Sequence, residues 1–500
     1  MALTLASAFF LISRTAADPD LWGHVLFGLD LLRTGTLPQT DSYSYVTGNH
    51  PWINHEILSE VLFGFAYRTA GTPGLLTLKM AVTMSMVLLL YRHLLRRGLD
   101  PLRAGIILIL IIFAMLTSLG TMRPHLFTFL FFLLTLLAIE CADRGKTSWL
   151  WTLPLVFAAW INFHGGVLAG LGILFVWAGA RVVRDLPKRA PAGARRERVL
   201  LLGVVLASLL SLVVNPYAWR LPLFLVRTAT VPRPDISEWH PLGITTVPGI
   251  LYVMIVAIAG FILIQRRTRL SFPMLAVLAA TAVLPLMAYR HLALFALTFG
   301  VVMAGPLARS LPDKRGKRAE QDPGKRIVRA GMVAASMLAS LVFLASSAPS
   351  FVCIPIRPGP SIGFPAQAVG LLSQSGASGN LAIHFDYGEY AIWHLKDRFK
   401  VSMDGRRETV YPDSIYEEAL RFQGGRDSWD DVLERHPTDL ALVPVGGPTY
   451  NLLALKPGWQ LVHRDGLVGL FARESGQAAE RLRRPVSPTV PADGAGMCFP

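Results

Sequence analysis

Residues 104–116 read AGIILILIIFAML and residues 126–139 read LFTFLFFLLTLLAI, and neither stretch contains a charged side chain. Similar runs recur at 199–214, 250–264 and 332–345. With its flanks, each run supplies the roughly 20 residues that cross about 30 Å of hydrocarbon. Because lipid offers no hydrogen-bond partner to the backbone, such runs form membrane helices. The pattern predicts about 11 crossings in the first two thirds of the chain.

The composition agrees with a membrane protein. Of the 500 residues, 52% are hydrophobic and only 16% are charged, whereas about a quarter of a soluble domain is charged. The net charge of +15 is concentrated in one set of alternate loops, which the positive-inside rule places in the cytoplasm. Those loops are 92–103, 141–148, 181–198, 265–270 and 308–329. The basic excess therefore reflects topology, and we expect a cytoplasmic N-terminus and no nucleic-acid partner.

Three regions are expected along the chain. Residues 1–348 form the transmembrane bundle, including a long outer loop, 18–72, with amphipathic helices. Residues 349–473 alternate strand and helix patterns, which predicts an extracytoplasmic α/β domain. Its predicted strands are 381–385, 400–403, 439–443, 460–463 and 468–471. The tail, 474–500, is rich in Pro, Ala and Gly and is expected to be disordered. Cys353 and Cys498 could pair in an oxidising compartment, although spacing alone does not fix this.

Two groups of polar residues occur in the outer loop. The first is Asp18-Pro-Asp20 with His24. Carboxylates so near the membrane can act as a general base or bind a divalent cation. Equally, Asp18 can cap a helix and Asp20 can favour its dipole. The second group is His55 and Glu56, with Glu60 one turn later. These side chains can bind a metal or a polar substrate, or can simply stabilise a helix N-terminus.

A third group lies at the predicted outer ends of helices. Charged and imidazole groups at this depth are costly and usually face a cavity or a partner. Any one member alone is readily explained as structural, but their recurrence at one face favours an anion site next to lipid. The residues are Arg123, His125, His164, Arg290 and His291. In the α/β domain, Asp404-Gly-Arg406-Arg407-Glu408 follows a strand, and a turn held by ion pairs is the simplest interpretation of it.

Several of these motifs together resemble the GT-C superfamily of membrane glycosyltransferases, in particular a bacterial subgroup. The resemblance rests on the layout of residues 1–347 and on short motifs. These are Asp18-Pro-Asp-Leu-Trp22, Trp52-Ile-Asn-His-Glu56, Arg123-Pro-His125, Asn162-Phe-His-Gly-Gly166, Arg290-His291 and Met403-Asp-Gly-Arg406. It implies a bacterial inner-membrane enzyme that moves a sugar from a polyprenyl-phosphate donor to a glycan, lipid or protein acceptor on the extracytoplasmic face.

The resemblance also implies roles for individual residues. Asp18 and Asp20, with Glu56, would supply the catalytic base or the ligands of a divalent metal, Mg²⁺ or Mn²⁺. Basic residues would bind the donor phosphate and the substrate. The matching residue types are His24, His55, Arg123, His125, His164, Arg290 and His291. The hypothesis requires the carboxylates and the cationic groups to act together at the outer leaflet.

Two other functions are compatible with the sequence. A transporter or flippase of a lipid-linked or anionic substrate would place charged residues near the bilayer midplane and often contains a repeat. Here the polar residues gather at one face and no repeat is evident. A non-catalytic envelope-assembly protein would use the α/β domain to bind a partner, and the loop acids would then serve as caps and ion pairs.

Overall fold

The computed structural model describes residues 1–185, 192–231, 233, 236–265, 270–310, 323–356, 363–482 and 496–500. They form two compact units, each built from two separate stretches of the chain. The helical unit combines Met1–Thr15 with Leu76–Val352, and the sheet unit combines Ala16–Leu75 with Cys353–Pro500. The first loop therefore belongs with the C-terminal domain, which differs from the division expected from the sequence.

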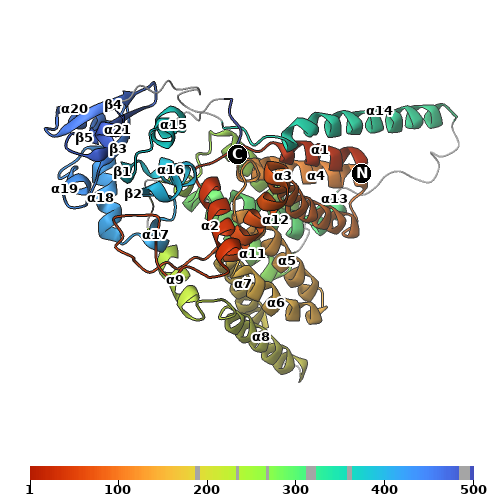
Figure 1. Ribbon diagram of the computed structural model, residues 1–500. Coiled ribbons are helices and arrows are strands. Elements are labelled where there is room, and N and C mark those ends of the chain that lie inside the picture. Colours follow the sequence, from red (N-terminus) through yellow and green to blue (C-terminus); the bar gives the residue numbers. More distant parts are fainter. Residues whose placement is uncertain are drawn as a thin grey trace. The chain divides into compact units, whose positions relative to one another are not determined.

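Apolar helices make up the helical unit (Figure 1). They are α1 (Ala2–Ser13), the second part of α3 (Ile57–Arg96), α4 (Pro101–Leu119), α5 (His125–Asp143), α6 (Leu153–Trp160), α7 (Val167–Asp185), α8 (Ala192–Ser211), α9 (Arg220–Ala229), α10 (Val247–Gln265), α11 (Phe272–Met287), α12 (Leu292–Val302), α13 (Ala304–Ser310) and α14 (Pro323–Ser347). Short 3-10 helices, Ser237–Trp239 and Tyr289–His291, lie in the connections.

Within the described residues, 6 helices are long and apolar enough to cross a membrane, or 7 if a bent pair forms one span. The pair is Tyr289–Val302 with Ala304–Ser310, bent by 53°. The predicted polytopic helical class is confirmed. The expected number of crossings was larger because hydropathy detects apolar runs without their breaks. A 3-10 helix, Thr147–Thr152, for example, leaves only 8 residues for α6.

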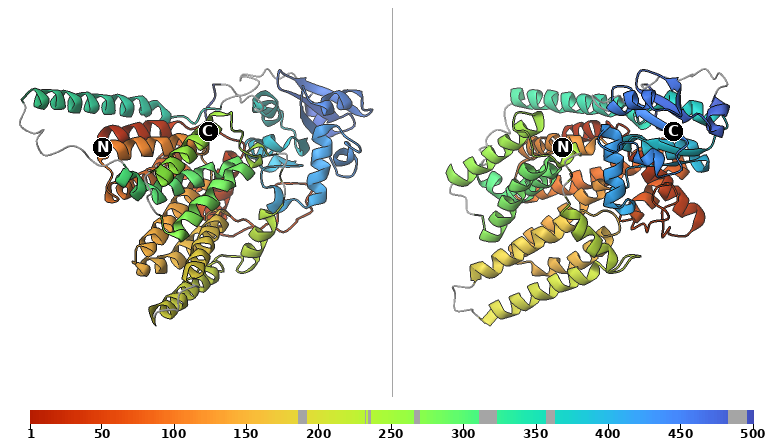
Figure 2. Two further views of the ribbon diagram at one scale, coloured as in Figure 1. Left: turned by 180° about the vertical axis from the view of Figure 1, so that it is seen from behind. Right: turned by 90° about the vertical axis from the view of Figure 1, so that its left-hand side faces the viewer.

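Packing in the helical unit is centred on α12, in which every side chain from Leu292 to Val302 is buried. At Gly300 a Cβ atom would lie 2.7 Å from Ile111 Cδ1, so the glycine permits close packing against α4. Helix α1 packs along α14, as the ribbon views show (Figures 1 and 2). Between these helices, Phe10 contacts Phe343 with ring centroids 5.3 Å apart. Large apolar side chains on α10 remain exposed, as expected for a surface in contact with lipid.

The sheet unit contains a five-stranded mixed sheet in the order β2-β1-β3-β5-β4. β1 pairs in parallel with β2 and β3, while β5 pairs antiparallel with β3 and β4. The strands are β1 (Gly379–Ile383), β2 (Phe399–Val401), β3 (Leu440–Pro444), β4 (Trp459–Arg464) and β5 (Val468–Arg473). The helices are α2 (Leu21–Thr34), the first part of α3, α15 (Ala366–Gln374), α16 (Gly388–Leu395), α17 (Arg407–Val410), α18 (Asp413–Gly424), α19 (Asp431–Glu434), α20 (Pro448–Leu455) and α21 (Gln477–Leu482).

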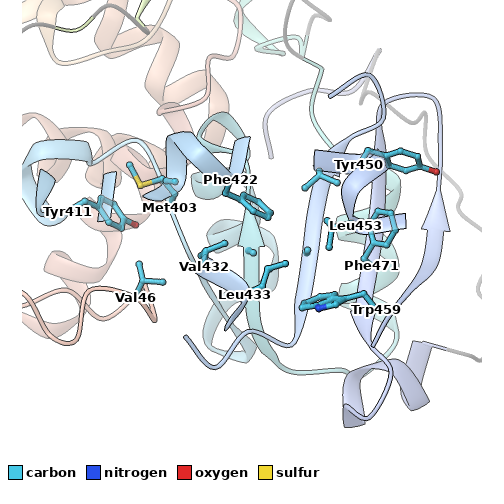
Figure 3. Close-up of a cluster of buried hydrophobic side chains, with 14 of the residues drawn as sticks. Val46, Met403, Tyr411, Phe422, Val432, Leu433, Tyr450, Leu453, Trp459 and Phe471 are labelled. Atoms are coloured by element: carbon cyan, nitrogen blue, oxygen red, sulfur yellow. The ribbon is translucent and has the colours of Figure 1, made fainter. Parts of the chain in front are cut away.

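The first loop is an integral part of this sheet unit. Ser44 pairs in parallel with Val401, so the loop adds one short bridge beside β2. Val46 and Trp52 join the hydrophobic core formed by residues of the α/β domain, and Figure 3 shows Val46 with Met403 and Tyr411. Burial of these aromatic and aliphatic side chains holds the loop against the domain through the hydrophobic effect.

The end of the chain is anchored rather than loose where the structure describes it. Cys353 forms a disulfide with Cys498, and the ring of Phe499, only 2% exposed, contacts the rings of Trp22, Tyr67 and Trp393. Residues 477–482 form α21. The disordered tail expected over 474–500 is therefore not found in these described parts. The disulfide and the aromatic contacts hold residues 496–500, and α21 packs against β5 with Ala478, Ala479 and Leu482 buried. Residues 483–495 lie outside the described residues.

A buried ion network links the first loop to the segment that follows β2. Arg406 Nη1 donates to Asp41 Oδ1 at 2.7 Å, and its Nε and Nη2 donate to Asp404 at 2.9 and 2.6 Å. Tyr411 Oη also donates to Asp404 Oδ2 at 2.7 Å. The guanidinium carbon lies 4.8 Å from the centre of the Trp52 ring. The motif that follows β2 is thus a turn held by ion pairs, in accordance with the simplest interpretation of its sequence.

Replacement of Arg406 by Met should destabilise the sheet unit strongly. The substitution leaves two buried carboxylates without their counter-charge, which costs about 3–5 kcal/mol. We expect a large fall in the apparent Tm of the purified protein in detergent. Arg435→Ala is the matched control, because Arg435 is 65% exposed and pairs with Asp431 on the surface. An unchanged Tm for Arg406→Met would contradict the structural role of the network.

Candidate active site

The N-terminus of α2 presents the two aspartates of the first sequence motif. Asp18 Oδ1 accepts the backbone N–H of Asp20 at 3.0 Å. Asp20 occupies the N-cap position of α2, and its carbonyl accepts the N–H of His24 at 3.0 Å, but its side chain makes no capping hydrogen bond. Asp18 therefore fixes the turn before the helix. The carboxylate of Asp20 does not serve the helix as a cap.

Glu389 of α16 brings a second carboxylate to the same place. Its Oε2 accepts the N–H of Gly23 at 3.0 Å. A Cβ atom on Gly405 would lie 2.5 Å from Asp20 Oδ1 and 2.7 Å from Glu389 Oε1. Both oxygens therefore crowd the same glycine, within about 5 Å of each other, a range in which like charges interact strongly. Glycine at positions 23 and 405 leaves the space that the two carboxylates occupy.

The electrostatic surroundings of Glu389 disfavour a negative charge. Burial raises the pKa of Glu389 well above its usual value, and the charges of Asp20 and Asp404 raise it further. Arg406 acts in the opposite direction but does not outweigh these effects. The side chain is 3% exposed. The protonated form of Glu389 is thus favoured beside Asp20.

His24 faces two carboxylates from the start of α3. Its Nδ1 lies 3.5 Å from Glu60 Oε1 and 3.7 Å from Glu56 Oε2. Burial alone lowers the pKa of His24, but the interactions with the nearby carboxylates of Glu60, Glu56 and Asp20 outweigh burial and raise the pKa to about 9. One potential ligand atom from each of these three side chains lies within 4.8 Å of the others, so the group can hold a metal ion. It includes Glu56 but neither Asp18 nor Asp20.

Two glycines explain why His24 meets this part of α3. A Cβ atom on Gly28 would lie 1.8 Å from the carbonyl oxygen of Glu60, and one on Gly64 would lie 2.5 Å from the carbonyl carbon of Gly28. The two helix backbones therefore touch at these positions. Asn54 then orients the acids: its Nδ2 donates to Glu60 Oε2 at 2.5 Å, and its Oδ1 accepts the N–H of Glu56 at 2.9 Å. His55 Nε2 lies 3.6 Å from Glu56 Oε1.

The helical unit brings together two of the predicted cationic residues. Arg290 Nη1 lies 3.2 Å from Glu238 Oε1, and Arg123 Nη1 lies 3.9 Å from Glu238 Oε2. Burial alone raises the pKa of Glu238, but the charges of Arg290 and Arg123 outweigh burial and lower it. Trp239 lies next to the guanidinium groups of Arg233 and Arg290, at 4.2 and 4.6 Å from its ring centre. An acidic side chain thus occupies a place suited to an anion.

The predicted histidines of the helical unit have local partners. His125 Nε2 bonds the carbonyl of Ser118 at 2.7 Å, and His291 Nδ1 bonds that of Leu284 at 3.3 Å. His164 Nδ1 lies 2.9 Å from both Thr128 Oγ1 and the N–H of Gly166. These bonds fix helix ends and a turn. For these three residues, the contacts support a structural role more directly than phosphate binding.

Sequence reasoning did not single out Glu389 or Glu238. Glu389 lies 366 positions from the N–H that it accepts, so no local spacing connects the two. Glu238 lies in a connection without apolar periodicity. Glu389 packs against Gly23 and Gly405, and Glu238 lies between two arginines. These contacts form only when segments far apart in the sequence come together in the fold.

Neither a protein-family model nor a curated protein matches the sequence of this chain. Solved structures do. ArnT from Cupriavidus metallidurans, bound to undecaprenyl phosphate, matches with a TM-score of 0.56 and 12% identity over 95% of this chain and 98% of that chain.

Two structures from Archaeoglobus fulgidus match at similar levels. The oligosaccharyltransferase AglB, in complex with an inhibitory peptide and a dolichol-phosphate, has a TM-score of 0.54 and 13% identity over 95% of this chain and 74% of that chain. The oligosaccharyltransferase complex with Zn and sulfate has a TM-score of 0.51 and 13% identity over 92% and 70%. The chain therefore has the same fold as ArnT and these oligosaccharyltransferases, which agrees with the fold that the resemblance of its motifs implied.

Proposed function

We propose that the chain is a membrane glycosyltransferase that moves a sugar from a polyprenyl-phosphate donor to an acceptor on the extracytoplasmic face. The observation that carries the proposal is the carboxylate of Asp20, which is held at the start of α2 without a capping role and lies beside the buried Glu389. A second support is the fold, since proteins of this fold have been solved with undecaprenyl phosphate and dolichol-phosphate.

In the proposed reaction, Asp20 accepts the proton of the acceptor hydroxyl as the oxygen attacks the anomeric carbon. The bond from that carbon to the phosphate oxygen breaks, and the polyprenyl phosphate leaves with the electron pair. Arg123 and Arg290 stabilise the charge that develops on the phosphate. A single displacement of this kind inverts the configuration at the anomeric carbon.

A divalent metal fits the group formed by His24, Glu56 and Glu60, because imidazole nitrogen and carboxylate oxygen are common ligands and the three atoms are close. These residues differ from the expected set of Asp18, Asp20 and Glu56. When bound, the ion would act as a Lewis acid towards a phosphate oxygen. Asn54 would hold Glu60 and Glu56 in position for it through the two hydrogen bonds described above.

Asp20→Asn should abolish most of the transfer. The amide cannot accept the acceptor proton, so we expect kcat to fall about 10²- to 10⁴-fold. Asp18→Asn is the matched control, because an asparagine oxygen can still accept the N–H of residue 20. The assay measures transfer from a polyprenyl-phosphate sugar in membranes. Wild-type rates in Asp20→Asn would remove the base assignment.

Variants at the arginine pair should change the donor KM in opposite directions. Arg290→Ala removes a charged hydrogen-bond donor, so KM should rise roughly 10-fold or more. Glu238→Gln removes the competing negative charge, so the arginines bind phosphate more readily and KM should fall. Arg227→Ala, at an exposed position of α9, is the control. If both variants keep the wild-type KM, this pair does not bind the donor phosphate.

The Cys353–Cys498 disulfide supports an oxidising compartment for the sheet unit, since disulfides rarely persist in the cytoplasm. The chain has 3 cysteines, of which Cys141 is free. Protein denatured directly from cells in a thiol-reactive reagent should carry one modification, and reduction beforehand should raise this to three. Three modifications without reduction would contradict the extracytoplasmic placement of this unit.

A further inference from the structure

The helix α16 of the C-terminal α/β domain carries a buried charged residue, Glu389, at its start. Tyr390, Ala391 and Ile392 of α16 are buried apolar residues of the domain. Tyr390 contacts Trp22 of α2, and Glu389 reaches the first turn of the same helix, where its Oε2 accepts the N–H of Gly23. The α2 and α16 helices pack against each other within the sheet unit. A fully buried glutamate is costly unless its oxygens are satisfied, so this placement demands an explanation.

Helix capping alone does not account for Glu389. One oxygen would suffice to accept the N–H of Gly23, and a neutral residue could do so without burying a carboxyl group. The other oxygen, Oε1, crowds Gly405 together with Asp20 Oδ1. Glu389 therefore makes two contacts at once, one with the backbone that carries the motif and one with the surroundings of the Asp20 carboxylate.

We propose that Glu389 is a positioning residue of the transfer site, which holds the Asp20 carboxylate and the first turn of α2 in the orientation needed for proton abstraction. The inference rests on the proposed function and assigns the α/β domain a direct part in it. The reaction then depends on this domain for the orientation of the Asp20 carboxylate, in addition to any contact that the domain makes with an acceptor.

The raised pKa of Glu389 gives this contact a physical basis. A protonated carboxyl group can donate a hydrogen bond to the neighbouring carboxylate, whereas two ionised groups would repel each other. Rigid support of this kind matters because a small misplacement of a catalytic group lowers the rate strongly. Gly23 and Gly405 are part of the same arrangement, since a Cβ atom at position 23 would lie 2.2 Å from Glu389 Oε2.

The test compares Glu389→Gln with Glu389→Ala in the full-length protein in membranes. Glutamine keeps the shape of the protonated side chain and retains both an acceptor and a donor, so kcat should stay within roughly 3-fold of wild type. Alanine removes both contacts, so kcat should fall roughly 10- to 100-fold while the donor KM changes little, because donor binding does not involve this side chain.

A control separates positioning from general stability. Glu418 is also a buried glutamate of the α/β domain, and it pairs with His436 at 3.0 Å. Glu418→Ala should lower the apparent Tm without lowering kcat of the folded protein. Hydrogen exchange of the peptide that contains Gly23 gives a readout independent of activity: protection should be lost in Glu389→Ala and kept in Glu389→Gln.

The outcomes distinguish this inference from the proposed function. If the wild type is active and Glu389→Ala is equally active, the positioning role is overturned and the proposed function stays intact. Equal losses of kcat in Glu389→Gln and Glu389→Ala also overturn it, since the neutral isostere should restore the geometry. Wild-type protein without sugar transfer from a polyprenyl-phosphate donor overturns both.

Discussion

The guanidinium group of Arg406 is the contact on which the sheet unit depends most. It bonds Asp41 from the first loop and Asp404 from the segment after β2, and it is covered by the ring of Trp52. A buried ion pair contributes little net stability, but it enforces one arrangement because any other leaves a buried charge without a partner. Arg406 thereby also fixes the neighbouring Gly405, the residue around which Asp20 and Glu389 converge.

Three different solutions to buried charge occur in the described part of the chain. In the Arg406 network, opposite charges are paired and hydrogen-bonded. Around His24, two carboxylates favour the protonated imidazole. At Glu389, burial and the nearby charges of Asp20 and Asp404 favour the protonated, uncharged carboxyl group. The first arrangement suits a structural role, whereas the other two leave groups that can exchange a proton or a cation, which is a property of reactive sites.

The sequence predicted those features that local patterns determine. Apolar runs such as 104–116 revealed the membrane helices, and alternation revealed all five strands, with β5 expected at 468–471 and found at Val468–Arg473. The motif around Asp18 and Asp20 was also recognisable. The sequence predicted only part of the group that can bind a metal. The close contact of the two helices at Gly28 and Gly64 determines which carboxylates lie next to His24. Glu389 and Glu238 act across long separations, which no spacing rule encodes.

The sheet unit is assembled from Ala16–Leu75 and Cys353–Pro500, with Leu76–Val352 of the helical unit between them in the sequence. During synthesis the first segment therefore leaves the ribosome long before the strands against which Val46 and Trp52 pack. Val46 and Trp52 lack these partners in the C-terminal domain until the last part of the chain is made, a situation that favours binding of chaperones. A chain truncated before residue 353 would retain its membrane helices but would display an unfolded loop, and quality-control proteases would degrade it.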